Sequence, residues 1–208
     1  MSKVTNWGYT VTDADSLESM LTVKEFESIT GGKYEGDERT EPNIKAACAA
    51  VRNYCNWHVS PSHECVLSDT FFSRRVTCNG STVLIQLPAK FVSAVDSVTI
   101  GETAYTTFIF ETNGLVKVYG VNLCGLKEYS PVSVEYTAGF DNGSIDGLKE
   151  LIAHRVTHAL ASSGGVQSET AGGVSITYSA NWINSARSTA LADDNKEVLA
   201  PYRVQGVF

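Results

Sequence analysis

The middle third of the chain carries the pattern that most constrains the fold. From about residue 66 to 138 the sequence is made of short runs rich in β-branched and aromatic residues, and residues 132–136 alternate strictly before Gly139. Such alternation has the period of a strand with one buried face. The pattern therefore predicts an antiparallel β block in this region.

Two Asn-Gly pairs divide the block. Asn79-Gly80 lies between the strand-like runs 70–78 and 82–87, and Asn113-Gly114 lies between the runs 105–110 and 115–119. Asn-Gly favours tight hairpin turns because both residues tolerate a positive φ. We therefore expect a hairpin at each pair.

Helical patterns precede and follow the β block. Thr22 and Glu25 have capping-box spacing and predict a short helix over about 22–30. Thr40-Glu41-Pro42 has an N-cap hydroxyl, an early acid and a first-turn proline, which predict a helix over about 41–58. A third helix is expected over about 146–162. The fold class is therefore α+β: a small helical bundle with an inserted antiparallel β block and an extended C-terminal arm.

The ends of the chain lack the periodicity of its centre. Residues 1–20 are polar and are interpreted as an N-terminal extension, and residues 21–164 as the core. Residues 165–208 are interpreted as a Gly/Ser-rich linker, an extended segment at 174–178 and a C-terminal docking tail.

Composition argues against several functional classes. The 208 residues include 23 acidic and 16 basic side chains, for a net charge of −7, whereas a dedicated nucleic-acid binder usually has a clustered basic face. No apolar run approaches the roughly 20 residues that a membrane-spanning helix needs. The N-terminus lacks the apolar core of a signal peptide, so synthesis in a cytoplasm is expected. Five irregularly spaced cysteines indicate reduced thiols.

Two clusters contain residue types that bind metals. Cys55, His58, His63 and Cys65 form the pattern Cys-x2-His followed by His-x-Cys, which suits zinc in ligand type but not in the spacing of zinc fingers. A zinc-binding protein using this cluster is one alternative reading. The other interpretation is that these residues belong to the core and to a loop.

His154 and His158 form the second cluster, at i and i+4 of the third predicted helix. This spacing can place two imidazoles on one metal ion, but the glutamate of the metalloprotease motif is missing. Helical histidines at a surface or interface are the alternative. We assign no metal and no cofactor from the sequence.

Signatures of catalysis are missing from the sequence. It contains no Gly-x-Ser-x-Gly elbow, and none of its Gly-Gly pairs is followed by the Lys-Ser/Thr of a phosphate-binding loop. The expectation is a protein that is not an enzyme.

Several segments resemble motifs of the head–tail connector (adaptor) proteins of tailed phages, and they follow one another along the chain in the same order as in that family. Val-Glu-Tyr-Thr-Ala-Gly-Phe at 134–140 is similar to the family's turn before a helix, and Leu-Ala-Pro-Tyr-Arg at 199–203 is similar to its C-terminal ending. The other segments are 21–26, 44–51, 87–98 and 172–179.

The resemblance implies a structural subunit of the virion neck. Such a subunit forms a homo-oligomeric, dodecameric ring between the portal protein and a tail or head-closure protein, and genomic DNA passes through its lumen without sequence-specific binding. Another phage neck or head-completion protein is the alternative within the same class. Since DNA must slide past, the lumen is expected to be neutral to acidic.

The same resemblance suggests which residues contact partners. The C-terminal tail would dock on the portal through the residues Leu199, Pro201, Tyr202, Arg203 and Val204. The extended segment would form an inter-subunit arm through Val174, Ile176 and Tyr178.

Overall fold

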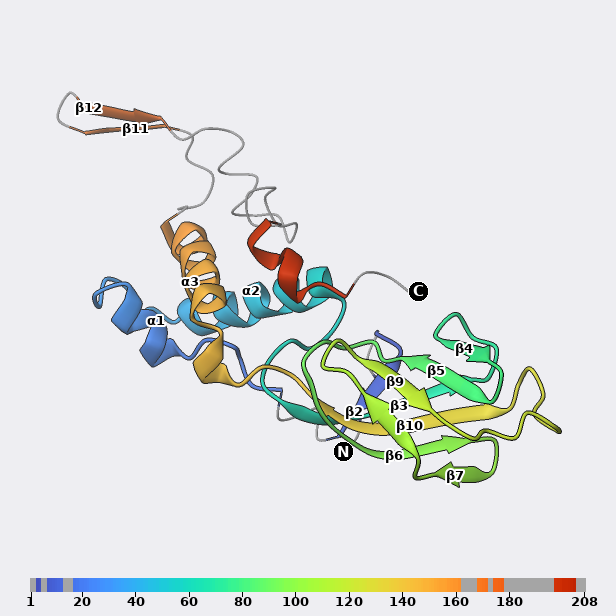
Figure 1. Ribbon diagram of the computed structural model, residues 1–208. Helices are drawn as coiled ribbons and strands as arrows, with labels where there is room; N and C mark the ends of the chain where they lie inside the picture. Colours follow the sequence, from blue (N-terminus) through green and yellow to red (C-terminus); the bar gives the residue numbers. More distant parts are fainter. Residues whose placement is uncertain are drawn as a thin grey trace. The chain divides into compact units, whose positions relative to one another are not determined.

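The computed structural model describes residues 3–4, 7–12, 17–161, 168–171, 174–177 and 197–204. The chain divides into two compact units (Figure 1). One, here called the β unit, comprises residues 1–18, 55–144 and 202–208. The other, the helical unit, comprises residues 19–54 and 145–201.

The β unit contains a six-stranded antiparallel sheet in the order β1-β2-β3-β10-β6-β7. Its strands are β1 (Lys3–Val4), β2 (Tyr9–Val11), β3 (His63–Thr70), β6 (Val92–Ile100), β7 (Thr103–Tyr105) and β10 (Pro131–Ala138). The central strand β10 alternates as the sequence predicts, with Val132, Val134, Tyr136 and Ala138 buried. The predicted β block is thus confirmed.

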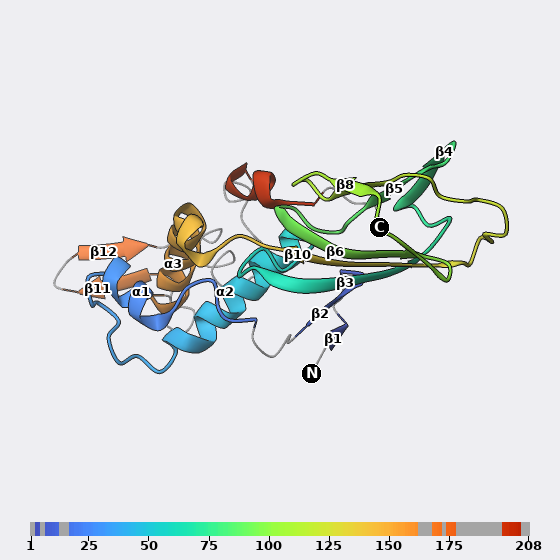
Figure 2. The same ribbon diagram turned by 60° about the horizontal axis from the view of Figure 1, so that its bottom comes forward.

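A four-stranded sheet in the order β4-β5-β9-β8 completes the β unit. Its strands are β4 (Val76–Asn79), β5 (Thr82–Gln86), β8 (Phe108–Phe110) and β9 (Leu115–Val118). In Figure 2 this sheet lies next to the larger one. Val83, Ile85, Val116 and Val118 are fully buried on one of its faces, so both sheets contribute to the core of the unit.

Both predicted hairpins form, with differences in detail. In the first, Asn79 pairs with Thr82, so the turn is Gly80-Ser81 and not Asn79-Gly80. In the second, β8 and β9 pair across the loop that contains Asn113-Gly114. The predicted run 105–110 is not one strand, because Tyr105 ends β7 in the larger sheet and Phe108 begins β8 in the smaller one.

The prediction of an N-terminal extension over residues 1–20 is wrong for its described residues. Tyr9–Val11 forms β2, which pairs with Val66 and its neighbours in β3. Tyr9, Val11 and Met20 are almost completely buried. A three-residue strand is too short to show periodicity, and it depends on tertiary contacts such as the pairing with β3.

The helical unit contains α1 (Val23–Ile29), α2 (Thr40–Cys55, whose last residue lies in the β unit) and α3 (Asp146–Ala161). The capping box of α1 is confirmed, since the Thr22 hydroxyl accepts from the Glu25 amide and the Glu25 carboxylate accepts from the Thr22 amide. The apolar core residues of this unit include Leu21, Phe26, Ile44, Val51, Leu148, Ile152 and Val156.

Two boundaries of α2 differ from the prediction. Thr40 is the first helical residue and not the cap, and its hydroxyl is buried without a hydrogen-bond partner in the described structure. The helix ends at Cys55 and not near residue 58, because Asn56 has the left-handed φ of 63° that terminates many helices.

The expected extended segment after the linker is a strand of a hairpin. β12 (Val174–Thr177) pairs antiparallel with β11 (Ser168–Ala171), a segment that the sequence pattern assigned to the linker. Tyr178 lies outside the described residues. The α+β class with an antiparallel β block is confirmed.

Candidate functional site

Two hydrogen bonds, one from a side chain and one between backbone groups, hold the C-terminal segment Tyr202–Val204 within the β unit. The indole Nε1 of Trp57 donates to the carbonyl oxygen of Tyr202 at 2.6 Å. The amide of Val204 donates to the carbonyl oxygen of Cys55 at 3.0 Å. Because the Val204 side chain is also buried, this segment is a packed part of the unit.

Four aromatic side chains surround the attachment point and are called the aromatic cluster: Trp57, Phe91, Phe140 and Tyr202. Phe140 stacks on Phe91 at a centroid distance of 4.6 Å and meets the Tyr202 ring edge-on at 5.3 Å. Trp57 is fully buried, whereas 46% of Phe91 is exposed. The cluster therefore extends from the core of the β unit to its surface at Phe91.

Unusual backbone geometry brings these rings together. Phe91 has a φ of 54°, which bulky residues rarely adopt, and its carbonyl oxygen accepts from the Gly139 amide. Gly139 has a φ of 126°, and a Cβ there would lie 2.6 Å from the Pro61 carbonyl oxygen. The glycine before Phe140 is thus required by close backbone packing.

His58 is buried beside the aromatic cluster. Together with its hydrogen-bond partners Tyr9 and Ala138 it forms what is here called the polar node. Its Nε2 lies 2.8 Å from the carbonyl oxygen of Ala138, which can only accept, so Nε2 carries the proton. Its Nδ1 lies 2.8 Å from the Tyr9 hydroxyl, which also accepts from the His58 amide at 3.1 Å. The neutral imidazole satisfies every one of these bonds.

These bonds argue against a zinc site at Cys55, His58, His63 and Cys65, because both ring nitrogens of His58 already hold protein partners. Burial raises the pKa of Cys55 and of Cys65 to about 12, which opposes the thiolate that zinc needs. Within the described residues no group of three or more potential ligands could hold one ion. The core interpretation of this cluster is the one the geometry favours.

The predicted portal-docking residues differ in their exposure. Leu199 and Val204 are buried, Tyr202 is partly buried, and Pro201 and Arg203 are exposed. Contact with a portal stays a prediction, and Pro201 and Arg203 are the two members of this set that solvent reaches. The inter-subunit role of Val174 and Ile176 also stays a prediction, and both residues lie in β12.

Sequence reasoning missed two members of the aromatic cluster, Trp57 and Phe91. Both lie in irregular segments without hydrophobic periodicity, so no pattern linked them to the C-terminal segment. Phe140 belongs to the motif at 134–140 and Tyr202 to the motif at 199–203, so the sequence analysis singled out both of these residues, but it did not link them to each other.

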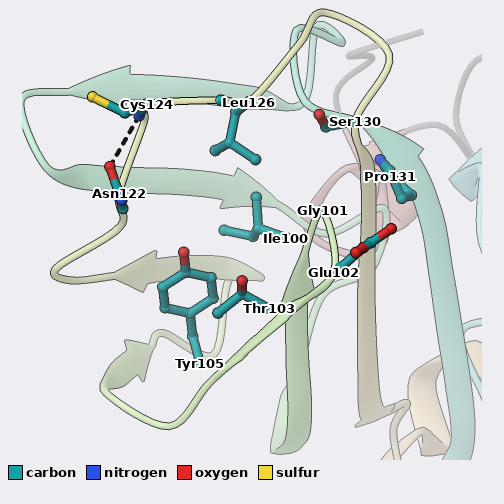
Figure 3. A pocket seen from close by; sticks show the side chains of 11 residues that line it. Ile100, Gly101, Glu102, Thr103, Tyr105, Asn122, Cys124, Leu126, Ser130 and Pro131 are labelled. Carbon is teal, nitrogen blue, oxygen red and sulfur yellow. Dashed lines mark hydrogen bonds between the residues drawn. The ribbon is translucent and has the colours of Figure 1, made fainter.

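A separate open cavity of about 550 Å³ lies at the β6–β7 turn (Figure 3). Its walls come from Gly101, Glu102 and Tyr105 on one side and from Asn122 and Leu126 on the other. Asn122 accepts a hydrogen bond from the Cys124 amide at 3.0 Å, which holds the loop in place. Among the described residues that line the cavity, Glu102 carries the one carboxylate.

None of the helices in the described part of the chain has the length and apolar character required to cross a bilayer.

Comparisons with known proteins identify structures with a similar fold, but they assign the chain to no family. No protein-family model matches the sequence, and no curated protein matches it. Among solved structures, the chain is similar to a chain from the neck of a native GTA particle, computed with C12 symmetry. The TM-score is 0.51, the identity is 14%, and the match covers 100% of this chain and 97% of the other.

A second match is a chain from the neck of an empty GTA particle, computed with C6 symmetry. It has the same TM-score and identity and covers 96% of this chain and 97% of that one. At this low identity the likeness concerns the fold, and it extends over almost the whole of both chains.

Proposed function

We propose that this protein is a non-enzymatic structural subunit of a phage-type neck, carried in the virion after synthesis in the host cytoplasm. In this proposal it forms a homo-oligomeric adaptor ring between the portal and a tail or head-closure protein, and DNA passes through the lumen. The full-length fold likeness to neck chains of a GTA (gene transfer agent) particle carries the proposal. The ordered sequence motifs support it independently.

The chemistry of the β unit supports the absence of catalysis. The Cys55 and Cys65 thiols have pKa values raised to about 12, so they remain protonated and weakly nucleophilic near neutral pH. His58 uses both ring nitrogens in structural hydrogen bonds and has none left for proton transfer. The buried polar groups of this unit therefore serve the fold.

The symmetry of the matched assemblies supports the ring proposal. The matched chains come from necks computed with C12 and C6 symmetry, and a closed ring needs the same two patches on every subunit. With a net charge of −7, we expect a lumen that is neutral to acidic, which DNA can pass without adhering. A continuous Lys/Arg belt lining the lumen would contradict this expectation.

Electron microscopy of the protein mixed with its portal tests the main proposal. We expect a ring at the outer end of the portal. A ring attached to a head-closure protein instead would favour the alternative neck role, and no association with any neck component would refute both.

The C-terminal contact can be tested separately with Arg203→Glu. Arg203 is exposed, and guanidinium groups are frequent in interface hot spots, so charge reversal should weaken portal binding at least about tenfold. Arg74→Glu is the matched control, since Arg74 is an exposed arginine of the same unit. Equal portal affinity of the two variants, measured by surface plasmon resonance, would place the docking surface elsewhere.

A further inference from the structure

Two imidazoles converge on the surface of α3. His154 and His158 are one helical turn apart, their Nε2 atoms are 3.0 Å from each other, and their ring centroids are 4.2 Å apart. His154 is exposed and His158 is partly buried. The i, i+4 spacing allows the two rings to meet, but the conformations of their side chains decide whether they do.

The 3.0 Å separation of the two Nε2 atoms allows either a hydrogen bond between the rings or the binding of one metal ion by both. In the neutral pair one Nε2–H donates to the lone pair of the other Nε2. If the donating ring moves its proton to Nδ1, both Nε2 lone pairs become available. Imidazole nitrogens bind zinc at about 2.0–2.1 Å. For such bonds a nitrogen separation of 3.0 Å corresponds to an angle at the metal of about 95°, close to octahedral or square-planar coordination.

An exposed carboxylate lies on the same helix as the two imidazoles. Glu150 lies one further turn towards the helix start and is exposed, so its spacing puts a negative charge on the same helical face. Among the described residues, no third His, Cys, Asp or Glu side chain completes a metal-binding group with the two imidazoles.

We propose that His154 and His158 form a chelating site for a divalent late-transition-metal ion such as Zn²⁺, Ni²⁺ or Cu²⁺, with the remaining coordination positions open to water. Imidazole suits these ions, whereas Mg²⁺ and Ca²⁺ prefer oxygen ligands. The site is distinct from the rejected Cys55–Cys65 cluster, and the proposal is independent of the neck assignment.

Isothermal titration calorimetry of untagged protein with Zn²⁺ and Ni²⁺ in a buffer of about pH 7.5 tests the site. The protein should carry Cys78→Ser and Cys124→Ser, since both thiols are exposed and could bind metal themselves. We expect one ion per chain. His154→Gln and His158→Gln should each weaken binding at least about tenfold, because either change leaves a single imidazole.

The matched control combines His158→Gln with Ala161→His. It preserves two histidines on α3, but their separation becomes seven residues, about 10 Å along the helix, which is too far for one ion. This variant should bind as weakly as His158→Gln alone, with an unchanged circular dichroism spectrum. If it binds as tightly as the parent protein, or if the parent binds neither ion, the proposal is wrong.

Discussion

The two units of this protein are stabilised in different ways. In the β unit, buried polar groups bond to partners far away in the sequence: His58 binds Tyr9 and Ala138, which are 49 and 80 residues distant. In the helical unit, polar stabilisation lies nearer the surface, in the Thr22–Glu25 capping box and in the ion pair between Lys149 and Glu25. Removing the partner of a buried polar group lowers the free energy of unfolding much more than removing the partner of an exposed one.

This difference predicts where the chain tolerates amino-acid substitutions. Around His58 the backbone is close-packed, and every group of the node has a specific partner, so single-atom changes should be costly. On the surface of the helical unit, water can replace a lost partner. The following substitutions test this contrast, beginning with the largest expected effect.

Gly139→Ala should have the largest effect. Its Cβ would meet the Pro61 carbonyl oxygen at 2.6 Å, at a φ of 126° that residues with a side chain rarely adopt. We expect the free energy of unfolding to fall by about 3 kcal/mol or more in urea titrations.

Gly120→Ala is the control for backbone strain alone. Gly120 also has a positive φ, of 71°, but no atom lies within 4 Å of the place that a Cβ would occupy there. The expected cost is about 1 kcal/mol. Equal costs at Gly139 and Gly120 would show that close packing beside His58 contributes little.

Tyr9→Phe should have the next largest effect. It removes the hydroxyl that binds both the Nδ1 and the backbone amide of His58, so two buried polar groups lose this hydrogen bond. The expected loss of stability is about 2 kcal/mol, measured by thermal and urea unfolding.

Tyr136→Phe provides the comparison for Tyr9→Phe. The Tyr136 hydroxyl is buried and makes no hydrogen bond of acceptable geometry within the described structure. Its removal should be neutral or slightly stabilising. A loss as large as that of Tyr9→Phe would mean that the polar node extends to Tyr136.

Glu25→Gln should have the smallest effect. The Lys149 ammonium, followed by the Thr22 amide, lowers the pKa of Glu25 to about 2. Because 41% of the Glu25 side chain is exposed, solvent screening limits the loss to about 0.5 kcal/mol.

The pH dependence of this variant follows from the sign of the shift. A lowered pKa stabilises the folded state fully above the unfolded value of about 4.5, and this stabilisation disappears as the pH falls towards about 2. Wild type and Glu25→Gln should therefore converge in stability at about pH 2. Glu41→Gln is the control, because its ion pair with Lys45 has both side chains mostly exposed and should contribute nothing measurable.

Parts of the candidate site were predictable because their signals are local. The Ala-Gly-Phe motif marked the end of β10, and the spacing of His154 and His158 put both on one helical face. The partners of Tyr202 could not be predicted, because Trp57 is 145 residues away and its segment has no periodicity. Whether the two imidazoles converge was equally open, since it depends on side-chain conformation.

By itself, the sequence determined the elements that short-range interactions specify. The capping box, the two hairpins and the alternation of β10 depend on neighbours a few residues apart, and each appears in the structure, although the first hairpin turns at Gly80-Ser81 and not at Asn79-Gly80. Only the tertiary structure decided that Tyr9–Val11 joins the sheet, that residues 105–110 are shared between two sheets, and that His58 has no nitrogen left for zinc. These outcomes depend on contacts between distant segments, whose free energy no local pattern reveals.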